Sequence, residues 1–200
     1  MQTYPSAERN KQPLFDQLRP HIQSAAHVLE VSSGTGQHVA YFASGCPSTI
    51  FQPSEFNRDL LPSIQAHIDH FRLSNVRPPL FLDAANQTQW EPLAYHRYDL
   101  VLVTNLTHIA PWEVTLGLLR GASTILRTHR YLCIYGPFKR DGEFTTESNE
   151  TFDRDLRAKN PQWGLRDIDD VAHAALIHQL KLVKVVDMPA NNYLLFLVKE

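Results

Sequence analysis

The segment Val28-Leu-Glu-Val-Ser-Ser-Gly-Thr-Gly36 constrains the fold of this chain more than any other. The apolar run from His27 to Val31 predicts a buried strand, and Val39, Ala40 and Ala43 predict the helix that follows it. Glycines therefore lie where a strand turns sharply into a helix, and glycine lets a ligand approach the backbone closely. In open α/β sheets, ligands bind at such turns, beyond the carboxyl ends of the strands. A tight turn without a ligand is the alternative interpretation.

Apolar runs alternate with amphipathic stretches along the whole chain, a pattern typical of βαβ units and a mainly parallel sheet. A helix is expected to begin after Pro13, another to end at Gly45, and a third to open at Pro111 with Leu116, Leu119 and Leu126 on one face. Further helices are expected at 57–71, 152–159 and 167–180, and a polar loop at 139–149. The other expected strands are 49–52, 80–82, 99–104, 131–135, 182–186 and 193–198. The last two are joined by a short turn, so the final strand should run antiparallel to its neighbour.

Length and composition bound the class of protein. With 200 residues, 43% of them hydrophobic, the chain suits a single domain over 1–200, in which 1–26 form an N-terminal helix and lid segment. The net charge is −2, and the sequence has no cluster of basic residues along one face, which disfavours nucleic acid as a partner. No apolar run is long enough for a membrane span. Cys46 and Cys133 lie in apolar surroundings, and we expect a protein of the reducing cytoplasm.

The spacing around the glycine turn separates two classes of ligand. A dinucleotide fingerprint needs a third glycine three residues after the second, and Val39 occupies that position. An S-adenosylmethionine site has no phosphate to hold and needs acceptors for an ammonium group and for ribose hydroxyls. It commonly has an acidic residue four positions before the turn glycine, as Glu30 stands before Gly34. The turn therefore favours S-adenosylmethionine as cofactor over NAD.

Further candidate cofactor-binding residues follow the successive strands. Glu55, about 20 residues after Gly36, can accept hydrogen bonds from both ribose hydroxyls. Asp83 could accept from the adenine amine with Ala84 beside the ring, and Asn105 would lie near the methionine portion or the reacting methyl group. Each carboxylate could instead be a helix cap or a solvated turn residue. Acidic residues at three successive strand ends beside a glycine turn nevertheless point to one site.

These residues occur together with four further motifs: Glu8-Arg-Asn-Lys11, Asn105 to Ile109, Tyr135-Gly-Pro-Phe138 and Pro189-Ala-Asn-Asn192. Over nearly the whole chain the sequence resembles a methyltransferase-like family that is catalogued as a domain of unknown function and has bacterial and animal members. The resemblance implies an α/β, Rossmann-like class I methyltransferase fold, with about seven strands in a mixed sheet, an antiparallel last strand and helices on both faces. It does not imply a substrate.

Carried over to this chain, the family's glycine motif falls on Glu30, Gly34 and Gly36, and its acidic position after the second strand falls on Glu55. The sequence departs from the pattern at two positions. Ser32 stands where class I enzymes usually have glycine, within the cofactor-binding turn, and Phe51 stands where the family more often has tryptophan. The serine can enter the turn at modest strain.

The candidates for chemistry are sparse, as expected for a transfer from an already activated donor. His108 is a candidate base, and Tyr135 and Asn105 are candidates for orienting the substrate. Arg9 and Asn10, placed before the first helix, together with Tyr135, are candidate substrate-binding residues, with Arg9 holding an anionic group. Structural roles remain open for each.

The histidine pairs lack a third ligand, so we expect no metal site. We expect a methyltransferase acting on a small molecule or a protein side chain, and leave its oligomeric state open. A non-catalytic protein that binds S-adenosylmethionine or S-adenosylhomocysteine is the first alternative, and an NAD-dependent oxidoreductase is the second.

Overall fold

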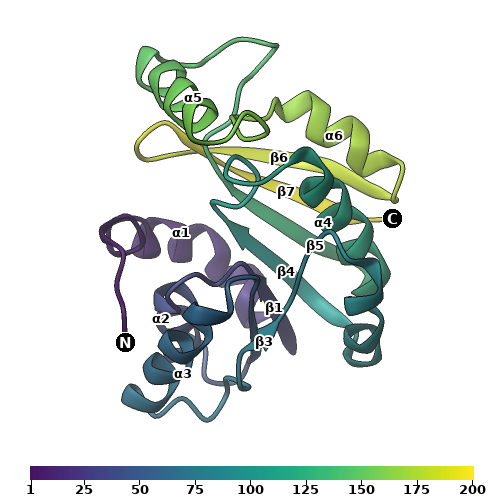
Figure 1. Cartoon of the computed structure of the whole chain (residues 1–200). Helices are drawn as coiled ribbons and strands as arrows, with labels where there is room; N and C mark the ends of the chain where they lie inside the picture. Colours follow the sequence, from purple (N-terminus) through teal and green to yellow (C-terminus); the bar gives the residue numbers. More distant parts are fainter.

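The computed structural model describes residues 1–200 and is built on one twisted sheet (Figure 1). Its strands lie in the order β3-β2-β1-β4-β5-β7-β6. β7 pairs antiparallel with both β5 and β6, whereas the other pairs are parallel. The expected seven-stranded mixed sheet with an antiparallel last strand is thus confirmed. The strands are β1 His27–Val31, β2 Ile50–Glu55, β3 Leu80–Phe81, β4 Tyr98–Thr104, β5 Leu126–Gly136, β6 Leu180–Met188 and β7 Asn192–Lys199.

Helices cover both faces of the sheet, and the buried side chains form two separate clusters. One cluster joins the sheet to α1, α2 and α3, and the other joins it to α4 and α6 (Figure 1). The helices are α1 Pro5–Gln23, α2 Gln37–Gly45, α3 Leu61–His70, α4 Trp112–Ile125, α5 Glu147–Lys159 and α6 Ile168–Leu176. Short 3-10 turns form η1 Arg58–Leu60, η2 Gln87–Gln89 and η3 Glu91–His96.

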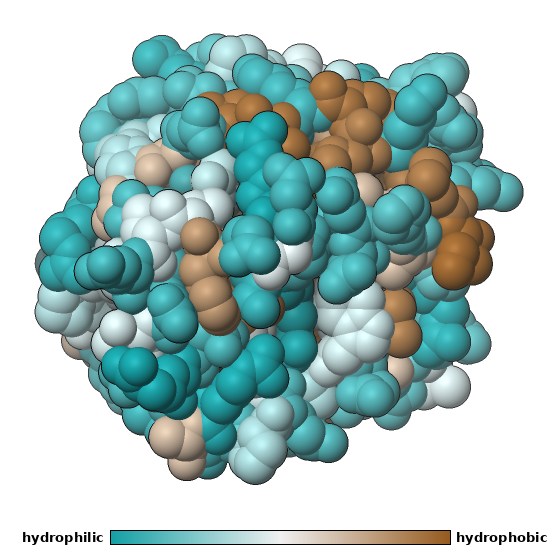
Figure 2. Space-filling model, turned by 90° about the horizontal axis from the view of Figure 1, so that it is seen from above, coloured by the Kyte–Doolittle hydropathy of each residue, from teal (hydrophilic) through white to brown (hydrophobic).

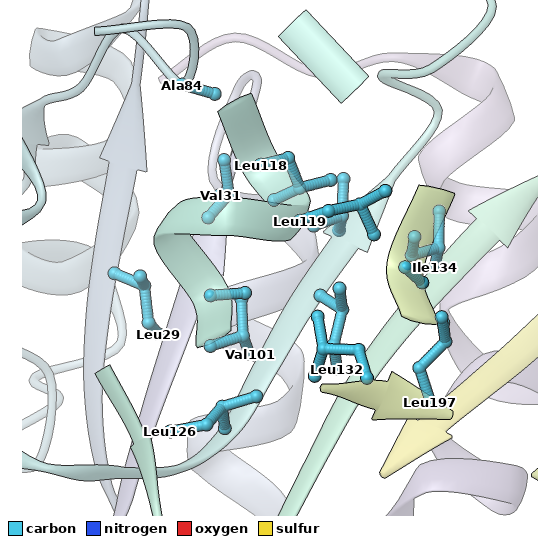
Figure 3. Close-up of a cluster of buried hydrophobic side chains, with 14 of the residues drawn as sticks. Leu29, Val31, Ala84, Val101, Leu118, Leu119, Leu126, Leu132, Ile134 and Leu197 are labelled. Atoms are coloured by element: carbon cyan, nitrogen blue, oxygen red, sulfur yellow. The ribbon is translucent and has the colours of Figure 1, made fainter. Parts of the chain in front are cut away.

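The alternating faces of the central strands explain the two clusters. Leu29 and Val31 point to the α4 side, where they pack with Val101 and Leu118, as Figure 3 shows. Val28 belongs to the opposite cluster, because successive residues of a strand point to opposite faces. Every residue of β4 is buried, as expected for an apolar run at the centre of a parallel sheet. The face seen in Figure 2 is mostly hydrophilic, with several groups of apolar side chains.

The first helix begins at Pro5, not after Pro13, so the predicted start was wrong. Pro5 occupies the first turn, where a missing N–H is tolerated, and Pro13 and Pro20 lie inside the helix. The apolar face continues upstream to Ala7, which is buried in line with Leu14. Burial of that face against the sheet holds the helix despite the internal prolines. As a result, the cluster around Arg9 belongs to the helix instead of preceding it.

Other boundaries also differ from the predictions. β5 begins at Leu126, a residue expected on a helix face, and Arg127 and Arg130 on its first half form ion pairs with Asp99. Leu116 of α4 is partly exposed instead of buried. α5 begins inside the expected loop at 139–149, and α6 ends before Gln179, whose φ of 59° lies in the left-handed region. No helix of the structure has the length and apolar character needed to cross a membrane.

Candidate functional site

The glycine turn links β1 to α2 through three residues with positive φ. They are Ser32 at 59°, Gly34 at 56° and Gly36 at 95°. A Cβ atom on Gly36 would lie 2.8 Å from the Cα of Ile64, so both conformation and packing require glycine there. Ser32 adopts a left-handed conformation at a cost of roughly 1–2 kcal/mol. Ser32, which stands where related enzymes usually have glycine, therefore introduces backbone strain into the turn.

Glu55, the last residue of β2, holds the turn in place. Its Oε2 accepts a hydrogen bond from the N–H of Gly34 (2.8 Å), and its Oε1 accepts from the N–H of Asn57 (2.9 Å). A carboxylate has about four lone-pair sites, so Glu55 keeps acceptor capacity for further donors. The predicted acidic residue therefore lies directly beside the predicted turn.

Glu30, the fourth residue of β1, is the most unusual group near the turn. Its side chain is buried, with 1% of the residue exposed, and neither carboxyl oxygen has a hydrogen-bond partner. Burial raises the pKa of Glu30 to about 8; the nearby hydroxyl of Ser33 partly offsets this rise, and the charge of Glu55 adds a smaller increase. Burying an unpaired carboxylate is costly, so a partner that supplies a positive charge or donors would stabilise it.

A first cavity of about 640 Å³ opens beyond the carboxyl ends of β1, β2 and β3. Ser32, Glu55, Asp83 and Ala84 line it, and all four were predicted as cofactor-binding residues. Glu30, Gly34 and Gly36 were predicted with them but do not line it. Oδ1 of Asp83 accepts from the N–H of Ala85 (3.0 Å). The cavity also has apolar walls, and its size is that of a small-molecule site. Its remaining lining residues are Val31, Phe56, Leu82, Ala85, Leu106, Ile109, Ala110, Pro111, Glu113, Val114, Gln162 and Trp163.

These features fit S-adenosylmethionine. The turn brings backbone to the edge of the cavity, the carboxylates of Glu55 and Asp83 supply acceptors, and the partnerless Glu30 lies on the strand that leads into the turn. No group of three or more His, Cys, Asp or Glu side chains in the structure is placed to hold a metal ion.

The residues before α1 cross the glycine turn. The N–H of Tyr4 donates to Oε1 of Gln37, and the N–H of Gln2 donates to the hydroxyl of Ser63 (2.8 Å). The ring of Tyr4 lies 3.9 Å from the position of a Cβ on Gly34, the nearest group to that point. Residues 2–4 therefore lie against the turn.

A second cavity of about 520 Å³ contains all the residues predicted for substrate binding and catalysis. Arg9 and Asn10 reach it from α1, Asn105 and His108 from the loop after β4, and Tyr135 from the end of β5. Asn105 lies here and does not line the first cavity, as its predicted place at the methionine portion would require. The remaining lining residues are Ser6, Ile109, Pro137, Asn149, Phe152, Pro189, Ala190 and Asn192. Ile109 lines both cavities, which makes them neighbours.

Two buried histidines lie at the second cavity: His108 lines it, and His38 lies behind Asn10, which lines it. Burial, with the nearby charge of Arg166, lowers the pKa of His108 to about 4, so its imidazole is neutral at pH 7. His108 packs edge-on to the ring of Phe152 at 5.6 Å. Burial also lowers the pKa of His38 to about 4, and its Nε2 lies 2.7 Å from Oδ1 of Asn10. His38 thereby fixes the amide of Asn10, which leaves the Asn10 nitrogen as a donor.

The loop after β4 is held rigidly. Asn105 has a φ of 55°, and its N–H donates to the carbonyl of Tyr135 (2.8 Å). The guanidinium of Arg166 donates to the carbonyls of Thr107 (3.0 Å) and Ala110 (2.6 Å). Burial raises the pKa of Tyr135, and a hydrogen bond from Asn10 partly offsets that rise. The loop is therefore tied to the end of β5 and to the segment before α6.

Sequence reasoning missed several residues of the second cavity. Phe152 and Asn149 come from α5, and no motif marked them. His38, which contacts Asn10 from outside the cavity, was not singled out among the ten histidines of the chain. Pro189 and Asn192 belong to a motif that supported the resemblance, but they were not assigned to a site. That motif was the signal that could have found them.

Known proteins resemble this chain in two ways: one family in sequence, and several solved structures in fold. The family described as "Protein of unknown function (DUF938)" matches residues 1–199. An O-methyltransferase family protein from Burkholderia thailandensis superposes with a TM-score of 0.84 at 15% identity, covering 98% of this chain and 57% of that chain. The S-adenosylmethionine-dependent methyltransferase SibL gives a TM-score of 0.77 at 17% identity, covering 97% of this chain and 55% of the other.

Human N-acetylserotonin methyltransferase, solved in complex with S-adenosylmethionine, gives a TM-score of 0.75 at 9% identity, covering 97% of this chain and 52% of the other. The chain therefore spans little more than half the length of each of these proteins. At such low identities the likeness shows the fold, which is the class I methyltransferase fold.

Proposed function

The chain belongs to the DUF938 family of proteins of unknown function, and we propose that it is an S-adenosylmethionine-dependent methyltransferase. One observation carries the proposal. Ser32, Glu55 and Asp83, which follow or end three neighbouring strands, line a single cavity beside the glycine turn. This is where ligands bind in open α/β sheets. The fold shared with known methyltransferases supports the proposal.

Each polar residue around the turn has a role in holding the ligand. The carboxylate of Glu55 accepts from the ribose hydroxyls while it keeps its bonds to Gly34 and Asn57. Asp83, with Ala84 beside it, accepts from the adenine amine. Glu30 is a buried carboxyl group near the turn without a hydrogen-bond partner, and the ammonium of the methionine portion would stabilise its ionised form.

The geometry disfavours a dinucleotide. A pyrophosphate needs close packing of α2 on the strand, which a third glycine permits. The side chain of Val39 fills that position and is fully buried. The cavity also carries three carboxylates, from Glu55, Asp83 and Glu113, and no Lys or Arg that could pair with a phosphate.

A second observation favours an enzyme over a protein that only binds the ligand. The second cavity adjoins the first, and Ile109 lines both. A protein that only binds S-adenosylmethionine or S-adenosylhomocysteine has no need of an adjoining polar cavity. We assign that cavity to the methyl acceptor, a small molecule or a protein side chain.

The sulfonium of bound S-adenosylmethionine supplies an activated methyl group, so the protein's task is chiefly positioning. Asn105 and Tyr135 orient the acceptor from the ends of β4 and β5. His108 is neutral at pH 7 and can accept a hydrogen bond from a protonated acceptor. Its low pKa makes it a weak base, so orientation is its main contribution.

The ligand is tested by isothermal titration calorimetry with S-adenosylmethionine, S-adenosylhomocysteine and NAD. Glu55→Ala should weaken binding of the first two by about 1–3 kcal/mol, because charge-assisted hydrogen bonds are lost. Asp59→Ala removes the same charge from an exposed position four residues on and should leave affinity unchanged. Binding of NAD alone would refute the proposal, and unchanged affinity in Glu55→Ala would show that the ribose site lies elsewhere.

Catalysis needs a separate experiment. Purified protein is incubated with methyl-labelled S-adenosylmethionine and either metabolite or protein extracts, and transferred label is measured. We expect label in one of the two fractions. Ligand binding without any transfer would favour the non-catalytic alternative.

A further inference from the structure

The second cavity contains a single charged group that has no partner. Among its lining residues, Arg9 is the only Lys, Arg, Asp or Glu. Its neighbours Glu8 and Lys11 pair with each other, whereas Arg9, a solvent-exposed residue at the edge of the cavity, takes part in no ion pair or side-chain hydrogen bond in the structure. The cavity therefore carries an uncompensated positive charge.

The neutral groups of the cavity leave that charge unopposed. His108 adds no charge at pH 7, since burial keeps it neutral. The amide nitrogens of Asn149 and Asn192 already donate to the main chain of the 189–191 turn. Phe152 and Ile109 supply apolar surface beside the polar end. The cavity thus combines a cationic end with an apolar wall.

We infer that the methyl acceptor is a small carboxylic acid, with its carboxylate held by Arg9 and its apolar body packed against Phe152. This inference rests on the proposed function and assigns the class of substrate for it. A guanidinium binds a carboxylate through two parallel N–H···O bonds. A phosphate dianion would call for more than one cation, and this cavity has one. A cavity of about 520 Å³ suits a molecule of metabolite size.

The test compares ligands that share a ring and differ in charge. Benzoate, benzamide and phenyl phosphate are titrated into the full chain, with and without saturating S-adenosylhomocysteine, and backbone amide shifts are followed by NMR. Benzoate should bind about tenfold more tightly than benzamide and more tightly than phenyl phosphate, and it should shift the signals of Asn105 and Tyr135. Equal affinity for benzoate and benzamide, or tighter binding of phenyl phosphate, would overturn the inference.

Two variants complete the test. Arg9→Gln should reduce benzoate affinity about tenfold while benzamide affinity stays constant. Arg19→Gln removes the same charge from an exposed position on the same helix and should change neither. Unaltered benzoate affinity in Arg9→Gln would also overturn the inference. Failure of S-adenosylhomocysteine to bind would refute the proposed function instead, since the comparison of benzoate with benzamide is also made without it.

Discussion

Replacing Glu30 with glutamine should change how the stability of the ligand-free protein depends on pH. Glu30 is buried without a hydrogen-bond partner, and its pKa rises from the ordinary 4.5 to about 8. The folded protein therefore holds this proton more tightly than the unfolded chain does. Below pH 4.5 both states are protonated and there is no penalty. As the pH rises towards 8, the unfolded chain loses the proton first, and stability falls.

The size of the effect follows from the two pKa values. Each pKa unit corresponds to about 1.4 kcal/mol, so the full loss between pH 4.5 and pH 8 is about 5 kcal/mol. Glu30→Gln cannot ionise and fills nearly the same volume, so its stability escapes this loss. The variant should therefore be similar in stability to the original protein at pH 4.5 and increasingly more stable up to pH 8.

Urea denaturation followed by tryptophan fluorescence at a series of pH values measures this difference. Other groups also titrate over this range, but they contribute equally to both proteins and cancel when the two curves are subtracted. Glu91→Gln, at an exposed position, serves as the control and should track the original protein. Parallel curves for Glu30→Gln and the original protein would refute the reasoning, because they would mean that Glu30 titrates alike in the folded and unfolded states.

Two further predictions concern His38, which contacts Asn10, and Gly117, which lies in α4. His38 has its pKa lowered by burial to about 4 from 6.5, so its contribution is fully present above pH 6.5 and is lost as the pH falls towards 4. His38→Gln should reduce acid destabilisation by up to about 3 kcal/mol in denaturation curves, and exposed His173→Gln should not. A Cβ on Gly117 would lie 2.3 Å from the carbonyl oxygen of Ala84, so Gly117→Ala should displace the loop after Asp83. We expect about 1–3 kcal/mol lower stability and weaker S-adenosylmethionine binding by calorimetry. Gly142→Ala, whose φ of 80° strains an alanine but whose Cβ meets no neighbouring atom, should lose some stability and leave binding intact. An unaffected Gly117→Ala would show that the loop accommodates the added methyl group.

The first cavity was largely predictable because its polar residues are marked by local pattern. Glu55 and Asp83 follow apolar runs, and the carboxyl ends of parallel strands meet at one edge of a sheet. The glycine turn is recognisable in the sequence because glycine readily adopts the positive φ angles that most other residues avoid. Fold class followed from the same periodicity and from the closing pair of strands.

The second cavity was only partly predictable because it depends on tertiary packing. Phe152 enters it through the position of α5, which no periodicity specifies. Pro13 led to the wrong predicted start of α1, since burial of the helix's apolar face outweighs the local preference of proline against a helix interior. The sequence also could not show that Glu30 has no hydrogen-bond partner, because this depends on which donors the tertiary packing places near its carboxyl group.

The wall that the two cavities share restricts how this protein can change its specificity. Ile109 lines both cavities, so a larger or smaller residue there alters the space for two ligands at once. Divergence towards a new acceptor would then proceed through residues such as Asn149 and Phe152, which line the second cavity alone. Variation among relatives should accumulate at those positions, while the residue at position 109 changes only in step with both ligands.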